Sequence, residues 1–247
     1  MKRNNTLHKI QDDHPAFGFT LVLGSPVMAE QAALGGFDWI WIDTQHGYWS
    51  DEHLLNALQV IGATETTPIV RSGSNEFYRI GRVLDAGALG VIVPMVNSAE
   101  EAKRAVDAAY YPPKGGRSRG GARLAALGDD YFEASAGEIL LAVMIETTEA
   151  LENLEEIAAV EGIDCLFLGP SDLSASMQTE YGSPEHENAI ARVLEAAQSA
   201  GVAPGFPCGD PEDALRRAEQ GFKLVTCYSD NGSMRAGIKH VQDALDD

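Results

Sequence analysis

The sequence repeats one local pattern, in which a helix-like segment ends at glycine and an apolar, strand-like segment follows within a few residues. Glycine readily takes the left-handed conformation that terminates a helix, and short runs rich in Val, Ile, Leu and Phe are typical of strands covered on both faces. The pattern occurs as GGFDWIWI at 35–42, AGALGVIV at 86–93, EGIDCLFL at 161–168, SAGVAPGF at 199–206 and EQGFKLVTC at 219–227. It predicts helices that alternate with buried parallel strands.

Three further apolar segments complete the set of candidate strands: AFGFTLVL at 16–23, TPIVR at 67–71 and EILLAVMI at 138–145. Amphipathic, helix-like segments lie between strands, at 51–63, 75–86, 98–111 and 147–160. Eight strand–helix alternations in 247 residues predict a (β/α)₈ TIM barrel that forms a single α/β domain over residues 1–247. A doubly wound open sheet is the alternative, but the chain has neither a GxGxxG turn after the first strand nor a P-loop.

Composition excludes several classes of protein. A formal net charge of −19 disfavours binding to nucleic acid or to an anionic membrane surface. The N-terminal segment lacks the apolar region of a signal peptide, and no stretch approaches the ~18 apolar residues of a membrane span, so we expect a soluble, cytoplasmic protein. Three scattered cysteines, Cys165, Cys208 and Cys227, indicate reduced and mostly buried thiols rather than a disulfide framework or zinc site.

In a barrel of this kind, chemistry is carried by residues at the C-terminal ends of the strands. The candidates are Asp43, Gln45 and His46 after the second strand, Arg71 at the end of the third, Glu146 after the fifth and Asp172 after the sixth. Trp39 and Trp41 share one face of the second strand, and we expect that face to pack against helices rather than to contact substrate.

Glu146 and Asp172 end neighbouring strands, so the two carboxylates should face one another at the barrel mouth. Two close carboxylates require a cation or a shared proton. Oxygen ligands from only two side chains leave coordination positions for water or substrate, as in Mg²⁺ and Mn²⁺ enzymes. Alternatively, each carboxylate simply caps the helix that follows it. The joint position of the two residues favours a metal site.

His46 and Arg71 have both structural and chemical interpretations. A single loop histidine is weak evidence, but His46 beside Asp43 can act as a general base, because its pKa suits proton transfer near neutral pH. Arg71 can pair with Asp43 or Glu146, or it can hold a carboxylate or enolate oxygen with its planar fork. A Schiff-base mechanism is disfavoured because none of the six lysines ends a strand.

One basic segment interrupts the acidic chain, PPKGGRSRGGARLAALG at 112–128, with Arg117, Arg119 and Arg123. Its charges indicate either contact with an anionic group of a substrate or with an acidic neighbouring subunit, or else a solvated loop. The sequence leaves these alternatives open.

Taken together, the motifs resemble one known family. They are DTQHG at 43–47, PIVR at 68–71, VLDAGALGVIVPMV at 83–96, YYPPKGGRSRGGAR at 110–123, IET at 145–147 and FLGPSDLSASM at 167–177. In this order they resemble the HpcH/HpaI family of class II, metal-dependent pyruvate aldolases, of the 2,4-dihydroxyhept-2-ene-1,7-dioate aldolase type. The resemblance runs from about Phe17 to near the C-terminus. It implies a (β/α)₈ barrel and a hexamer, a trimer of dimers, with the eighth helix swapped between subunits.

The resemblance also implies roles for particular residues. Glu146 and Asp172 would hold a divalent ion, Mg²⁺, Mn²⁺ or Co²⁺, that pyruvate chelates. Arg71 would contact the enolate oxygen, and His46 would be the base, supported by Asp43 and, able to act across a subunit boundary, by Asp85. Substrate contacts would further include the backbone of Gly169, Pro170, Ser171 and Asp172 at the carboxylate, together with Gln45 and Pro207.

The implied activity is that of a carbon–carbon lyase, which cleaves or forms 4-hydroxy-2-oxoacids from pyruvate, or hydroxypyruvate, and an aldehyde. Many members of the family carry glutamate where this chain has Gln45, and with the RS of GGRSRGG this resembles the subgroup that accepts hydroxypyruvate and varied aldehydes. Decarboxylation of oxaloacetate through the same enolate is an alternative. A non-catalytic barrel that senses a dicarboxylate or a metal is a third, which the intact set Asp172, Glu146, His46 and Arg71 disfavours.

Overall fold

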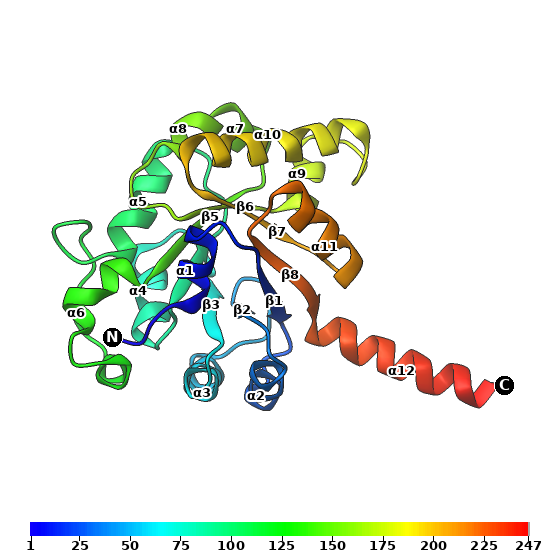
Figure 1. Ribbon diagram of the computed structural model, residues 1–247, viewed down its shortest axis with the longest axis horizontal. Coiled ribbons are helices and arrows are strands. Elements are labelled where there is room, and N and C mark those ends of the chain that lie inside the picture. Colours follow the sequence, from blue (N-terminus) through cyan, green and yellow to red (C-terminus); the bar gives the residue numbers. More distant parts are fainter. Residues whose placement is uncertain (247) are drawn as a thin grey trace.

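A computed structural model describes residues 1–246 of the protein. Within these residues eight parallel strands close into a barrel in sequential order (Figure 1). The strands are β1 (Ala16–Leu21), β2 (Trp39–Asp43), β3 (Thr67–Arg71), β4 (Gly90–Val93), β5 (Leu140–Ile145), β6 (Cys165–Leu168), β7 (Ala203–Pro207) and β8 (Leu224–Ser229). The predicted (β/α)₈ barrel is confirmed, and the open-sheet alternative is wrong because β1 pairs with β8.

Helices follow the strands, and most of them cover the outside of the barrel (Figure 1). The longer ones are α2 (Pro26–Leu34), α3 (Asp51–Gly62), α4 (Phe77–Asp85), α5 (Ala99–Ala109), α10 (Pro184–Ala200), α11 (Pro211–Gln220) and α12 (Asp230–Asp246). The shorter ones are α1 (Asn5–Gln11), α6 (Tyr131–Ala134), α7 (Thr148–Glu152), α8 (Leu154–Ala158), α9 (Pro170–Ser176) and the 3₁₀ turns Ala122–Leu127 and Ser135–Gly137. Serine caps start several of them, since Ser25, Ser50, Ser98 and Ser183 each accept the N–H three residues later.

The repeated glycine of the sequence has the conformation that the pattern predicts. Before each of five strands one glycine has a positive φ, at Gly36, Gly87, Gly162, Gly201 and Gly221. A residue with a Cβ is strained there, so glycine lets the chain leave each helix and turn into the next strand.

One predicted helix is wrong. The segment 147–160 forms two short helices, α7 and α8, rather than one, and Asn153 lies between them. The Asn153 side-chain amide donates to the Asn97 carbonyl oxygen at 2.8 Å. Asparagine favours such bonds over helix continuation.

Inward-facing side chains of the strands fill the barrel, and this corrects the expectation for the two tryptophans. Trp39 and Trp41 do not pack against helices; they lie in the interior cluster with residues such as Met144 and Phe167. Two glycines make room for these rings. A Cβ on Gly18 would lie 2.4 Å from the Trp39 indole, and one on Gly205 would lie 2.3 Å from the Phe167 ring. Glycine at these two positions therefore leaves the space that the Trp39 and Phe167 rings fill.

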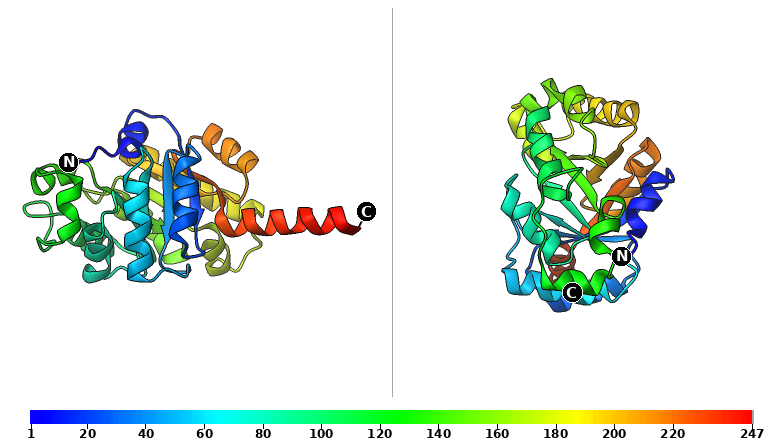
Figure 2. Two further views of the ribbon diagram at one scale, coloured as in Figure 1. Left: turned by 90° about the horizontal axis from the view of Figure 1, so that it is seen from below. Right: turned by 90° about the vertical axis from the view of Figure 1, so that its left-hand side faces the viewer.

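The two ends of the chain are placed differently. α1 lies at the N-terminal end of the barrel, where Leu7 and Ile10 join the interior cluster. α12 instead projects away from the barrel (Figures 1 and 2), although its first residue, the buried Asp230, accepts hydrogen bonds from the Val22 and Leu23 N–H groups at 3.0 Å. None of the helices in residues 1–246 is long and apolar enough to cross a membrane.

Candidate active site

Strand alternation brings three charged side chains to the inner side of the barrel mouth. Successive residues of a strand point to opposite faces, so residues two positions apart share a face. The inward-facing residues Trp41, Ile69 and Met144 are therefore followed by Asp43, Arg71 and Glu146. Asp43 and Arg71 are also direct partners in the β2–β3 register, which sets the two side chains next to each other.

A pocket of about 440 Å³ opens at this end of the barrel; we call it the mouth pocket. It is lined by Trp41, His46, Arg71, Met144, Gly169, Pro170, Ser171, Asp172, Tyr181, Pro207, Cys208 and Gly209. Most of the residues predicted from the sequence thus share one cavity. Glu146 is buried and does not line it. It lies behind Gly169, where a Cβ would approach Glu146 Oε2 to 2.5 Å.

Asp43 and Arg71 form a buried, bidentate ion pair. Arg71 Nε donates to Asp43 Oδ1 at 2.9 Å and Nη2 donates to Oδ2 at 2.5 Å. The guanidinium carbon also lies 4.9 Å from the centre of the Trp41 ring. Burial alone raises the pKa of Asp43, but the hydrogen bonds and charge of Arg71 outweigh burial and hold that pKa below its usual value. Asp43 is therefore ionised at neutral pH.

The same carboxylate organises the loop that carries His46. Asp43 Oδ1 accepts the backbone N–H groups of Gln45 at 3.0 Å and His46 at 3.2 Å. The turn closes when the Gly47 N–H donates to the Asp43 carbonyl oxygen, and a Cβ on Gly47 would lie only 2.2 Å from that oxygen. The His46 side chain is exposed at the pocket, whereas Gln45 Oε1 is buried without a hydrogen-bond partner.

Glu146 is fixed by the backbone of a neighbouring loop. The Met95 N–H donates to Glu146 Oε1 at 2.7 Å, and Met95 has a positive φ of 56°, a conformation that is costly for a residue with a side chain. Burial and the nearby Asp172 carboxylate raise the pKa of Glu146. Thr147, not Glu146, caps α7, so the interpretation of Glu146 as a helix cap is wrong. Asp172 is the third residue of α9, whose N-cap is Gly169.

The Glu146 and Asp172 carboxylates suit a divalent cation. They lie close enough for the Asp172 carboxylate to disfavour the charged form of Glu146, and a bound cation would relieve that repulsion. Among the residues that the structure describes, no group of three or more His, Cys, Asp or Glu side chains gathers in the manner of a complete metal site. Two protein carboxylates with the remaining positions open to water and substrate is the pattern of hard-cation enzymes.

Four residues singled out in the sequence lie elsewhere. Asp85, at the end of α4, does not contact His46 within this chain; its Oδ1 accepts from Arg117 Nη2 at 2.6 Å. Arg117 is 3% exposed and also lies over the Tyr111 ring, so for this residue a solvated loop is the wrong interpretation. Neither Arg117, Arg119 nor Arg123 lines the mouth pocket.

The sequence analysis did not assign Trp41, Met144, Tyr181, Cys208 or Gly209 to the pocket. For Trp41 and Met144 a signal was present, since each stands two residues before a predicted site residue on the same strand face. For Tyr181 no local signal exists, because it lies in the irregular segment between α9 and α10 and reaches the pocket only through the packing of that segment.

Comparison with known proteins places the chain in a family. Residues 17–236 match the HpcH/HpaI aldolase/citrate lyase family. The chain is 36% identical over 234 residues to a hydroxypyruvate/pyruvate aldolase of Paraburkholderia phytofirmans, which covers 90% of each chain. It is 38% identical over 232 residues to a 4-hydroxy-2-oxo-heptane-1,7-dioate aldolase of Klebsiella pneumoniae, covering 91% of this chain and 87% of that protein.

A crystal structure with the same architecture is also known. It is that of an HpcH/HpaI aldolase/citrate lyase family protein from Burkholderia cenocepacia, which is 33% identical and has a TM-score of 0.93 over 99% of this chain and 100% of that one. The resemblance inferred from the motifs is thereby confirmed over nearly the whole length. The protein belongs to the HpcH/HpaI aldolase/citrate lyase family.

Proposed function

We propose that the protein is a divalent-metal-dependent aldolase that cleaves 4-hydroxy-2-oxoacids to pyruvate, or hydroxypyruvate, and an aldehyde, and that runs the reverse condensation. The observation that carries this proposal is that two charged pairs lie at the barrel mouth, each with one member lining the mouth pocket. Glu146 and Asp172 offer paired carboxylates, and the Asp43–Arg71 pair presents a fixed cation beside them. Relatives named as aldolases of this reaction class support it.

Glu146 and Asp172 are the residues that would hold the ion, and their oxygen ligands favour Mg²⁺, Mn²⁺ or Co²⁺. When bound, the ion supplies positive charge that favours the enolate form of a 2-oxoacid. Glu146 is held for this task by the Met95 N–H, which fixes one carboxylate oxygen and leaves the other directed past Gly169. Because the pKa of Glu146 is raised, its carboxylate binds a proton more readily, and the proton competes with the ion for this group.

Arg71 has donors to spare after binding Asp43. Its Nε and Nη2 atoms face Asp43, while Nη1 has only the Met144 thioether sulfur at 3.8 Å, a weak acceptor. Negative charge grows on the 2-oxo oxygen as the carbon–carbon bond breaks. We place the Nη1 N–H groups of Arg71 at that oxygen, where a preorganised donor in a partly dry site stabilises the transition state more than the ground state.

His46 is the proposed base. In cleavage it takes the proton of the 4-hydroxyl group; the bond between C3 and C4 breaks, its electron pair forms the enolate, and C4 leaves as the aldehyde. A proton then returns to C3 to give pyruvate. The exposed ring of His46 lies at the pocket, on a loop that Asp43 fixes through two hydrogen bonds from backbone N–H groups. This loop therefore holds the ring in one position relative to the 4-hydroxyl group of the substrate.

The remaining contacts orient the substrate. The backbone N–H groups of Ser171 and Asp172 are the donors proposed for its carboxylate, with Gly169 and Pro170 shaping the wall; proline itself lacks an N–H. Pro207 supplies an apolar wall on the opposite side. Gln45 does not line the mouth pocket; its buried Oε1, which has no hydrogen-bond partner within residues 1–246, is proposed to accept a hydrogen bond from a water or hydroxyl group.

We further propose that the protein forms a homo-hexamer, a trimer of dimers with α12 exchanged between subunits. α12 projects from the barrel and carries exposed Met234, Ile238, Val241 and Leu245 at spacings of four, three and four residues. This spacing sets the four side chains on one helical face, which buries apolar surface only against another molecule. Asp85 would then act on the His46 of a neighbouring subunit.

A retro-aldol screen tests the proposed function. Purified protein is incubated with a set of 4-hydroxy-2-oxoacids and, separately, with oxaloacetate, in the presence of Mg²⁺, Mn²⁺, Co²⁺ or excess EDTA. Release of pyruvate and aldehyde with at least one ion, lost in EDTA, is the expected result. Turnover of oxaloacetate alone would instead favour a decarboxylase that uses the same enolate. Binding of the acids without turnover would identify the non-catalytic barrel.

A further inference from the structure

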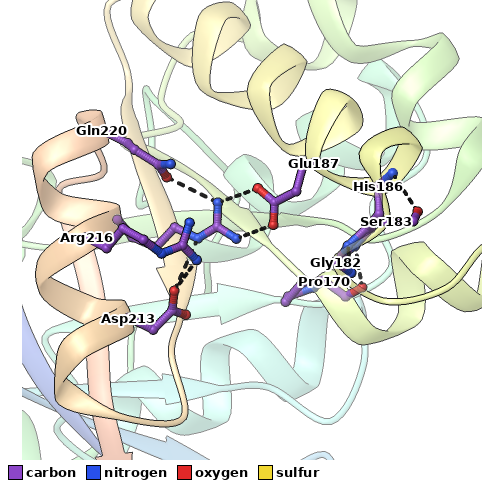
Figure 3. Close-up of polar contacts among 9 residues, drawn as sticks. Pro170, Gly182, Ser183, His186, Glu187, Asp213, Arg216 and Gln220 are labelled. Atoms are coloured by element: carbon purple, nitrogen blue, oxygen red, sulfur yellow. Dashed lines mark hydrogen bonds and ion pairs between the residues drawn. The ribbon is translucent and has the colours of Figure 1, made fainter.

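The His186 side chain joins two loops directly behind the mouth pocket. It is fully buried, its Nδ1 lies 3.0 Å from the Gly182 nitrogen, and its Nε2 lies 2.9 Å from the Pro170 carbonyl oxygen (Figure 3). A backbone N–H can only donate and a carbonyl oxygen can only accept. Both bonds therefore form together only when the ring is neutral and carries its proton on Nε2; this tautomer is assigned from the two partners.

The bond to Pro170 concerns the site because Pro170 is the first residue of α9. This helix has seven residues, and no side chain caps its N-terminus, so little within the helix itself holds the first turn. Gly169, which precedes Pro170, packs against Glu146 without room for a Cβ. Asp172 lies two residues after Pro170. A small shift of Pro170 would therefore change the separation of Asp172 from Glu146.

His186 is itself firmly held. The next residue, Glu187, accepts two hydrogen bonds from Arg217, at 2.9 Å and 2.7 Å, and Arg217 is 2% exposed with its guanidinium carbon 4.3 Å from the centre of the Phe206 ring of β7. Ser183 Oγ also accepts the His186 N–H at 3.3 Å. Figure 3 shows the Glu187 side chain turned toward α11, whereas the neighbouring His186, in the first turn of α10, lies beside Pro170, Gly182 and Ser183.

The His186 ring does not line the mouth pocket. Tyr181 does, and its ring centre lies 5.0 Å from that of His186. His186 thus bonds to Pro170, is held by its own neighbours, and does not reach the cavity. It can therefore affect the site only through the segment that contains Pro170.

We propose that His186 is a positioning residue, which fixes the first turn of α9 so that the Asp172 carboxylate and the Ser171 N–H keep their places beside Glu146. The proposal rests on the function proposed above, in which these groups hold the ion and the substrate carboxylate. It adds that the hydrogen bond from His186 of α10 to Pro170 determines how well the Asp172 and Glu146 carboxylates are preorganised.

Two substitutions separate the two bonds of the ring. In His186→Asn the amide oxygen can still accept from Gly182, but the donor to Pro170 is lost. In His186→Gln the longer side chain carries an amide donor to the place of Nε2. A matched control is Thr66→Val, which removes another buried side-chain donor at the opposite end of the barrel. Thr66 Oγ1 lies 3.0 Å from the Phe37 carbonyl oxygen and 3.1 Å from the Ala33 carbonyl oxygen.

Three measurements on the full chain test the proposal: amide hydrogen exchange of residues 170–177 without metal, Mn²⁺ affinity by calorimetry, and kcat and KM. For His186→Asn we expect faster hydrogen exchange in that segment and a lower kcat. Mn²⁺ should bind about tenfold more weakly, as is typical when a group that orients a metal ligand is lost. His186→Gln should recover most of each change. Thr66→Val should lower Tm without altering exchange of residues 170–177 or Mn²⁺ affinity.

The outcomes distinguish the possible failures. If His186→Asn lowers Tm but leaves Mn²⁺ affinity and the exchange of residues 170–177 at wild-type values, the ring is merely structural and the proposal is wrong. If the wild-type protein binds none of the divalent ions, the proposed function fails. In that case, unchanged hydrogen exchange of residues 170–177 in His186→Asn would overturn the positioning role as well. Faster exchange would show that His186 positions residues 170–177 without a role in ion binding.

Discussion

Replacing Asp43 by asparagine removes one charge of the most buried ion pair at the mouth. Asp43 is 3% and Arg71 8% exposed, and the pair has two direct hydrogen bonds. The asparagine amide group would face an arginine donor, and Arg71 would keep an uncompensated charge. Breaking a buried pair in this way costs about 3–5 kcal/mol. For a chain of this size we expect Tm to fall by roughly 6–20 °C, since each kcal/mol corresponds to about 2–4 °C.

The matched control is Asp51→Asn. Asp51 pairs with Arg82 at 3.0 Å, but the side chains are 65% and 52% exposed, so the loss should be at most about 1 kcal/mol. Thermal and urea unfolding at fixed protein concentration measure both variants. The low pKa of Asp43 sets the sign with pH: its contribution is present at neutral pH and is lost as pH falls through that pKa, so wild type and variant should converge in acid. Equal losses for the two variants would refute this account of the pair.

Three further substitutions test the site. Glu146→Gln should weaken the binding of divalent ions, measured by calorimetry, yet raise Tm of the metal-free protein at neutral pH. Because the pKa of Glu146 is raised in the folded protein, stability falls as pH rises through that pKa, and glutamine removes this loss; an unchanged Tm would contradict the burial of Glu146 as the cause. Arg71→Lys should lower kcat more than it changes KM, because the transition state carries more charge on the oxygen; the reverse pattern would assign Arg71 to ground-state binding. Gln45→Glu adds a negative charge near His46, which favours the imidazolium and should move the acidic limb of the rate profile to higher pH while tightening metal retention; if neither changes, Gln45 lies outside the site.

The sequence predicted the barrel well because the information is local and repeated. The glycines at 36, 87, 162, 201 and 221 mark helix ends by their conformation, and the third strand was predicted with the bounds that the structure has, Thr67–Arg71. The site positions followed from the same argument, since a barrel topology sends every strand end to one rim. Asp43, Arg71 and Glu146 needed only strand alternation to be placed together.

Other features were beyond local pattern. The two tryptophans were assigned to the wrong side of the sheet, although Trp41 shares its face with Asp43; consistent use of the alternation would have placed both inside the barrel. Asn153 divides a helix through a tertiary bond to Asn97, and Asp85 at the end of α4 pairs with Arg117 in a loop 32 residues later. Such contacts depend on packing between distant segments, which one sequence does not encode in any short motif.

The central claim is that Glu146 and Asp172 together hold an ion that favours the enolate of pyruvate. Exchange of the pyruvate methyl protons for deuterium in D₂O, followed by NMR with Mg²⁺, measures enolate formation without need of an aldehyde. We predict exchange well above the rate without protein, its loss in excess EDTA, and its loss in Asp172→Asn at equal Mg²⁺. Exchange that persists unchanged in EDTA and in Asp172→Asn would contradict the claim.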